Sequence, residues 1–179
     1  MSDPKRTRLV FLGFAEEMVA RTVLEVIKGG ISDKRIVVSD WALVHKAMGG
    51  KLTVTTDKGK DPGGVRGGLF GGGAGLLLAT LSGPIGAGAI LGGAAIGAVT
   101  AAMKDSGLKN DDIETVSTFM ADGRTGILLA IPLADADAFD VFAAEQPEFD
   151  ASDRRYQVDI VPGRTFEDAI DQYRLTEEA

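Results

Sequence analysis

A long stretch without charge, rich in glycine and near the middle of the sequence, constrains this chain more than any other feature. None of the 19 basic and 26 acidic residues lies within residues 67–103, and 15 of the 24 glycines fall within residues 63–107. In water, each glycine disfavours a helix by about 1 kcal/mol relative to alanine. A helix here therefore needs surroundings that force its backbone to bond internally, either lipid or a tightly packed protein interior.

Small residues recur at every fourth position of residues 63–104, which places them on one face of a helix. Such a face lets two helical backbones approach closely. A turn at Gly83 and Pro84 separates two arms, 65–82 and 85–103. Each arm is about 27 Å long at 1.5 Å per residue, which is short for a hydrocarbon core of about 30 Å. The sequence predicts a glycine-zipper helical hairpin over residues 63–104, with packing positions at Gly64, Gly67, Gly68, Gly71, Gly72, Gly75, Gly88, Gly92, Gly93 and Gly97.

The first arm of the hairpin carries two glycine ladders, whereas pairing within one hairpin uses a single face of each arm. These ladders run through Gly64, Gly68 and Gly72, and through Gly67, Gly71 and Gly75. The spare ladder predicts contact with a neighbouring subunit. Repetition of that contact gives a ring, a shell or a filament, depending on whether the rotation closes.

Basic residues flank both outer ends of the hairpin. Lys58, Lys60 and Arg66 precede it, and Lys104 and Lys109 follow it. By the positive-inside tendency, both ends belong on the cytoplasmic side of a membrane. Because glycine makes the arms only marginally hydrophobic, burial at the subunit interfaces of a soluble homo-oligomer is the alternative. A flexible linker fits less well, since linkers lack this density of leucine and isoleucine.

The residues on either side of the hairpin predict two halves of one α+β domain, 1–62 and 105–179. Apolar runs and turn residues in the first half predict a strand, a helix that ends at Gly29 and Gly30, and two more strands, over 8–14, 15–28, 35–44 and 51–56. The second half predicts a helix from residue 110 or 111 that ends at Gly123, a strand over 125–131, a helix over 134–145, an edge strand over 156–161 and a helix over 166–175.

Neither half alone has enough strands to bury both of its faces, so we expect both halves to form one antiparallel sheet. The closest simple arrangement is a ferredoxin-like sheet with helices, interrupted by the inserted hairpin.

Residues that carry catalysis or bind metals are scarce. The chain has no cysteine and a single histidine, His45, which excludes disulfides, thiolate sites and histidine-rich metal sites. His45 lacks a partner motif and is expected to be structural. The glycine pairs of the hairpin lack the third glycine of a dinucleotide-binding loop, and no Gly-Lys-Ser/Thr of a phosphate-binding loop follows them. Asp135, Asp137 and Asp140 lack the sixth-position glycine of a calcium loop. We therefore expect no catalytic residue, no cofactor and no metal.

Basic and acidic residues are unevenly distributed along the chain. Residues 1–66 hold 12 basic and 8 acidic groups, whereas residues 105–179 hold 6 basic and 18 acidic groups. A net charge of -7 and a pI near 4.7 disfavour binding to nucleic acid. The apolar run that follows the basic N-terminus is too short for a secretory signal, so the N-terminus is expected in the cytoplasm.

The order of these elements around GGVRGGLFGGGAGLLLATLSGPIGAGAILGGAAIGAVTAAM (63–103), with the strand TGILLAI (125–131) after it, resembles a known group of proteins. This is a bacterial membrane-protein family of unknown function, with a glycine-zipper hairpin inserted in a ferredoxin-like α+β domain. The resemblance covers nearly the whole chain. It implies a membrane location and this architecture, and it brings no catalytic residues.

We therefore predict a non-enzymatic, membrane-associated, self-assembling structural protein, with the hairpin as anchor and oligomerisation element. Its expected partners are further copies of itself and lipid. The alternative is a soluble homo-oligomeric ligand-binding or sensor module with the hairpin buried at subunit interfaces.

Overall fold

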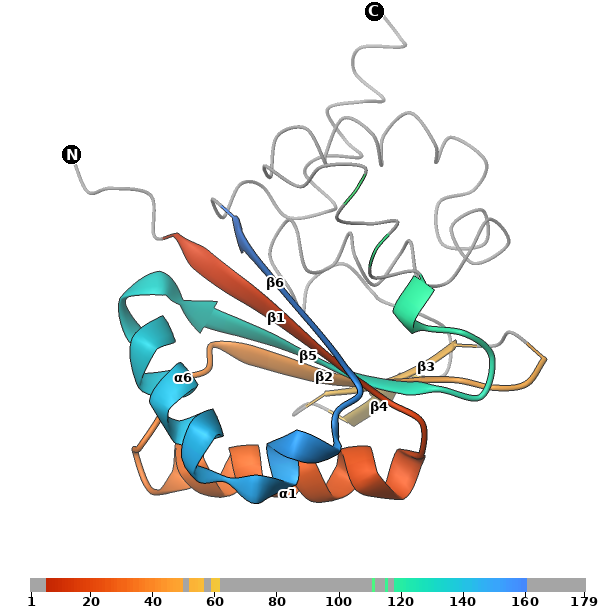
Figure 1. Cartoon of the computed structure of the whole chain (residues 1–179), viewed down its shortest axis with the longest axis horizontal. Helices are drawn as coiled ribbons and strands as arrows, with labels where there is room; N and C mark the ends of the chain where they lie inside the picture. Colours follow the sequence, from red (N-terminus) through yellow and green to blue (C-terminus); the bar gives the residue numbers. More distant parts are fainter. Residues whose placement is uncertain are drawn as a thin grey trace, which may run out of the picture.

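The computed structural model describes residues 6–49, 52–56, 59–61, 111, 115 and 118–160. The described helices and strands are β1 (Thr7–Phe14), α1 (Glu17–Ser32), β2 (Asp40–Lys46), β3 (Leu52–Thr56), β4 (Gly59–Asp61), β5 (Thr125–Pro132), the 3-10 helix η1 (Leu133–Asp135), α6 (Ala136–Glu145), the 3-10 helix η2 (Pro147–Ala151) and β6 (Arg154–Ile160). They form an α+β fold in which α1 and α6 lie together on one side of a sheet (Figure 1).

The described strands form one six-stranded sheet in the order β4-β3-β2-β5-β1-β6. Every neighbouring pair is antiparallel. β5 follows residues 63–104 in the sequence and lies between β1 and β2, which precede them. The expectation that both halves of the chain build one antiparallel sheet is therefore confirmed.

Both faces of the central strands are buried, which explains why β1 and β5 read as continuous apolar runs. Val10, Leu12 and Leu129 belong to the core that the sheet forms with α1 and α6. The residues between them in the sequence point to the opposite face. Leu9 and Leu128 lie on that face and are at most 2% exposed.

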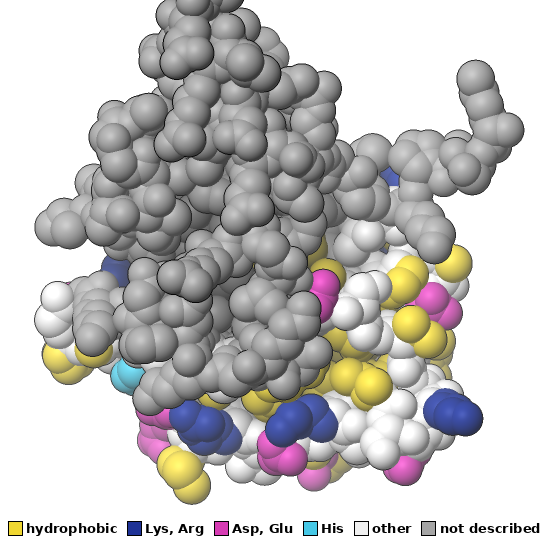
Figure 2. All heavy atoms as spheres, turned by 180° about the vertical axis from the view of Figure 1, so that it is seen from behind, with side chains coloured by type: hydrophobic (Ala, Val, Ile, Leu, Met, Phe, Trp, Pro, Cys, Tyr) yellow, Lys and Arg dark blue, Asp and Glu magenta, His cyan; other side chains and the backbone are white. Residues whose placement is uncertain are grey.

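Helix α1 buries an apolar stripe with helical spacing, formed by Ala20, Val23, Leu24, Ile27 and Gly30. Its outer face carries ion pairs along the helix, Glu17 with Arg21 and Glu25 with Lys28. Figure 2 shows basic and acidic groups interspersed along the lower edge of the molecule, where α1 lies. The outer face of α1 is therefore an ordinary charged surface.

The prediction that Gly29 and Gly30 end the first helix is wrong, because α1 continues to Ser32. Gly30 packs against α6 instead, where an added Cβ would lie 2.7 Å from the Phe142 ring. The helix closes one turn later, where Lys34 adopts a left-handed φ of 57°. A tertiary contact between two helices, and not the local stop signal, explains Gly30, whereas an added Cβ at Gly29 would meet nothing within 4 Å.

The strand predicted over 35–44 begins only at Asp40 and continues to Lys46. The amides of Arg35 and Ile36 both donate to the carbonyl of Gly30, at 2.9 and 3.3 Å. Because these amides close the end of α1, they are not available to a sheet. The prediction that residues 35–39 belong to this strand is wrong, since the strand begins at Asp40, although the amide of Ser39 already donates to the carbonyl of Ala130 in β5 at 2.8 Å.

The other predicted elements differ at their ends or lie partly outside the described residues. β1, β3 and β5 match the predicted strands to within one residue. The helix predicted over 134–145 starts as η1 and becomes α-helical at Ala136. The strand predicted over 156–161 is β6, which lies at one edge of the described sheet. The sequence did not predict β4 or η2. Residues 111, 115, 118 and 119 are helical, whereas the helix predicted over 166–175 lies outside the described residues.

The packing of Gly30 predicts opposite effects for two neighbouring alanine substitutions. Alanine at either position gains about 1 kcal/mol of helix propensity. An added Cβ at Gly29 meets nothing within 4 Å, whereas at Gly30 it meets Phe142 and Ile36. Overpacking of this kind costs about 1–3 kcal/mol. Urea unfolding should therefore show Gly29→Ala to be more stable than Gly30→Ala by that amount. Equal stabilities would show that α6 is not packed on Gly30.

Candidate functional site

The glycines to which the sequence assigns a function lie outside the described residues. These are the packing positions Gly64, Gly67, Gly68, Gly71, Gly72, Gly75, Gly88, Gly92, Gly93 and Gly97, and the turn at Gly83 and Pro84. The structure describes the places where the chain leaves the sheet and returns to it. It leaves after β4, which lies at one edge of the described sheet next to β3, and it returns to the central strand β5. Within the described ranges, no helix has the length and apolar character to cross a membrane.

Two side chains just before the turn into β5 pack on the face of the sheet opposite α1 and α6. The Phe119 ring lies 6.2 Å from the Phe11 ring, centroid to centroid, and Met120 is 1% exposed. Gly126 makes room for Phe11 and Met120, because an added Cβ would lie 2.5 Å from the Phe11 ring and 3.1 Å from the Met120 sulfur. The missing side chain at Gly126 therefore allows the returning chain to lie close against the sheet.

Backbone and side-chain bonds fix the turn between Met120 and β5. The amide of Gly123 donates to the carbonyl of Lys46 at 2.6 Å, and the amide of Lys46 donates to the carbonyl of Arg124 at 3.0 Å. Gly123 has a φ of 84°, a conformation that favours glycine at the end of a helix. The Arg124 guanidinium donates to the carbonyl of Phe119 at 3.0 Å and pairs with Asp153. The returning chain is thus tied to β2 and to the start of β6.

His45 lies at the end of β2, and its Nδ1 is 2.9 Å from the hydroxyl oxygen of Thr125. Thr125 is fully buried, and the Glu17 carboxylate lies 3.8 Å from the same nitrogen. A buried hydroxyl needs a hydrogen-bond partner. Since His45 provides one for Thr125, this geometry gives the histidine a structural role.

The three aspartates near α6 do not converge. Among the residues that the structure describes, no group of three or more histidine, cysteine, aspartate or glutamate side chains is arranged to hold a metal ion. Asp140 is 2.8 Å from the Arg155 guanidinium and 3.6 Å from that of Arg8. Asp140 therefore joins two cations from β1 and β6 to α6.

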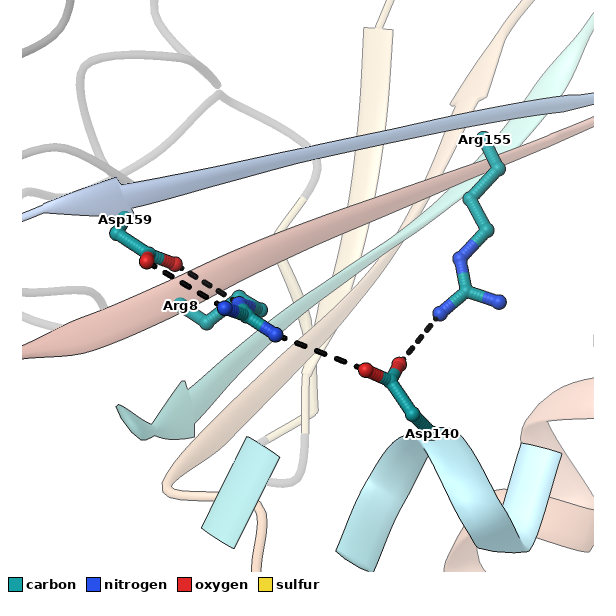
Figure 3. A network of polar contacts seen from close by, with 4 residues as sticks. All are labelled: Arg8, Asp140, Arg155 and Asp159. Atoms are coloured by element: carbon teal, nitrogen blue, oxygen red, sulfur yellow. Dashed lines mark hydrogen bonds and ion pairs between the residues drawn. The ribbon is translucent and has the colours of Figure 1, made fainter. Parts of the chain in front are cut away.

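These contacts belong to a network of four charged residues, which we call the edge network: Asp159, Arg8, Asp140 and Arg155 (Figure 3). Arg8 donates to both carboxylate oxygens of Asp159, at 2.8 and 3.4 Å. This hydrogen bond lowers the pKa of Asp159 and raises the pKa of Arg8, while partial burial opposes both shifts. This network could not be predicted from local sequence, because the pairing of β1 with β6 brings Arg8 and Asp159 together from opposite ends of the chain.

An open groove of about 600 Å³ runs beside this network, between α6, η2 and β6. It is lined by Asp140, Ala143, Ala144, Phe149, Asp150, Ser152, Arg155 and Gln157. Among the described residues that line the groove, the one guanidinium, from Arg155, is bonded to Asp140. These lining residues include no histidine.

Comparison with protein-family models, curated proteins and solved structures finds no match to this chain. The resemblance to a bacterial membrane-protein family thus stays a prediction.

The lowered pKa of Asp159 predicts how a substitution responds to pH. Because its pKa is lower in the folded chain than in the unfolded chain, the carboxylate stabilises the fold above the unfolded value of about 3.9. That contribution is lost as pH falls through the folded value. Asp159→Asn should lower the free energy of unfolding by up to about 1 kcal/mol at pH 7, as expected for an exposed pair.

Unfolding curves of Asp159→Asn and the parent chain should converge as the pH is lowered from 7 to 2. The matched control is Asp150→Asn, since Asp150 is exposed and forms no ion pair with the described residues. A loss of stability for Asp159→Asn that is the same at every pH would contradict an electrostatic origin.

Proposed function

We propose that this chain is a non-enzymatic, membrane-associated, self-assembling structural protein. The α+β domain is its cytoplasmic head, and residues 63–104 form the hairpin that anchors it and joins its copies. The main support for this proposal is that β2 and β5 pair directly, although a charge-free stretch over 67–103 lies between them in the sequence. We infer that the segment between these paired strands is a separate element with a role of its own.

The strand order supports a ferredoxin-like core for the head. β1, β2, β5 and β6 lie in the order β6-β1-β5-β2, with α1 between the first two in sequence and α6 between the last two. This is a β-α-β-β-α-β unit. Its middle connection, from β2 to β5, holds β3, β4 and the glycine-rich segment. The hairpin is thus proposed to be inserted at one end of a complete core, where a long excursion disturbs the sheet least.

Lipid is the proposed environment of the hairpin because it supplies what glycine-rich helices lack in water. In hydrocarbon, backbone groups must bond within the helix, and faces of small residues allow close helix pairing. The basic residues at both outer ends of the hairpin, such as Lys58 and Lys104, favour a cytoplasmic side for both termini. The proposed partners are therefore lipid and further copies of the chain.

The membrane association is tested by fractionation. When the chain is produced in bacteria, we expect it to pellet with membranes and to resist extraction by alkaline carbonate. Recovery as a dispersed small oligomer in a detergent-free soluble fraction would contradict the proposal. That result would favour the soluble sensor module with the hairpin at its subunit interfaces.

The role of the glycine ladders is tested by leucine substitutions. Gly71→Leu and Gly93→Leu block close backbone approach but raise hydrophobicity. Membrane pelleting should be kept, whereas size-exclusion chromatography and negative-stain imaging should show smaller assemblies. Gly73→Leu and Gly86→Leu are matched controls, since they make the same change at glycines outside the ladders. If all four variants keep the parent particle size, the ladders are not interfaces.

A further inference from the structure

Strand β6 is an outer strand of the described sheet and pairs there along one edge only, with β1. Arg155 and Gln157 are opposite Leu12 and Val10 of β1, which belong to the core under α1 and α6. Directly opposite residues share a face of a sheet. Arg155, Gln157 and Asp159 therefore share the helix side of β6, and all three are exposed.

The edge network has two unlike ends, and both lie on β6. Its charges alternate in the order Asp159, Arg8, Asp140, Arg155 (Figure 3). It starts with a carboxylate and ends with a guanidinium, four residues apart on the same face of one strand. In the described structure these two ends are not joined to each other.

We propose that β6 pairs antiparallel with β6 of a second copy of this chain, across a two-fold axis at Gln157. In this register Arg155 faces Asp159 of the second copy, and Asp159 faces its Arg155. The two edge networks then close into one ring of eight alternating charges. On the other face, Tyr156 faces Val158 of the second copy, an aromatic and β-branched pair of the kind that stabilises sheets.

The charges on β6 select this register against its neighbours. With the two-fold axis perpendicular to the sheet, both helix layers lie on the same side of the combined sheet, and residues of the same face are opposite each other. Moving the axis by one residue along β6 therefore shifts the pairing of the two strands by two residues. Centring on Tyr156 places Asp153 opposite Asp159 of the second copy, a repulsive pair. Centring on Val158 places Gln157 opposite Asp159 and leaves Arg155 without an acidic partner. Charges on an edge strand usually prevent pairing, but here one register makes them complementary.

This interface goes beyond the proposed function, because it uses only the head and no residue of the hairpin. It is isologous, since the same strand serves both copies, and such a contact gives a closed dimer. The hairpin contact is a separate source of association.

Cysteine cross-linking tests the register directly, because the native chain contains no cysteine. In Gln157→Cys the two introduced residues face each other, with Cα atoms about 4.5–5.5 Å apart. That distance is within the range of about 4.4–6.8 Å in which disulfides form. In Arg154→Cys the two cysteines would be about 20 Å apart, at about 3.3 Å per residue. Under mild oxidation of the full chain, Gln157→Cys should form the covalent dimer at least tenfold faster than Arg154→Cys.

Two further variants separate this interface from the proposed hairpin contact. Gly71→Leu and Gly93→Leu, added to Gln157→Cys, should leave the rate of cross-linking unchanged. Arg155→Glu, added to Gln157→Cys, should slow it severalfold, with the fold checked by circular dichroism. Equal rates for the Gln157 and Arg154 cysteine variants, loss of the link with the glycine substitutions, or no effect of Arg155→Glu would overturn the inference. None of these results depends on whether the chain pellets with membranes.

Discussion

The pairing of β5 with two earlier strands is the contact on which the rest of the structure depends. β1 and β2 meet only through β5 in the described sheet, and residues 125–131 are buried on both faces. The pairing of β1 and β2 with β5 therefore requires a part of the chain that follows the glycine-rich segment. This requirement costs little free energy, because each doubling of a flexible loop adds only about 0.6 kcal/mol. A long excursion between β2 and β5 is thus compatible with a stable head.

The end of that excursion is held more firmly than an ordinary linker would be. Phe119 packs on Phe11, the missing side chain of Gly126 lets Phe11 and Met120 lie over β5, and Arg124 ties the carbonyl of Phe119 to Asp153. These contacts give the chain a fixed position and direction where it rejoins the sheet. If the hairpin is an anchor, as proposed, these contacts fix the chain where it enters the head after the second arm, 85–103.

The sequence predicts the elements whose signals are local. β1 and β5 could be found because both of their faces are buried, which leaves continuous apolar runs, and alternation predicts β3. The predicted helix end at Gly29 and Gly30 failed because a glycine that admits a neighbouring ring looks the same in sequence as a glycine that ends a helix. The edge network could not be predicted without the strand order, since Arg8 and Asp159 are neighbours only across β1 and β6. The assigned hairpin glycines lie outside the described residues, so their roles stay predictions.

Charged residues and the glycine-rich segment lie in separate parts of the sequence, and this separation affects how copies of the chain could assemble. All its charges are outside 67–103. The proposed contact through β6 therefore depends on ion pairs, whereas the proposed contact through the hairpin depends on close packing of backbones. Salt weakens exposed ion pairs and has little effect on packing in an apolar environment. One two-fold contact joins only two copies, but a two-fold contact combined with a second, different contact links pairs into a larger assembly. A head and a hairpin that each associate with their own kind would therefore form a closed assembly of dihedral symmetry or an extended array, depending on whether the combined rotations close.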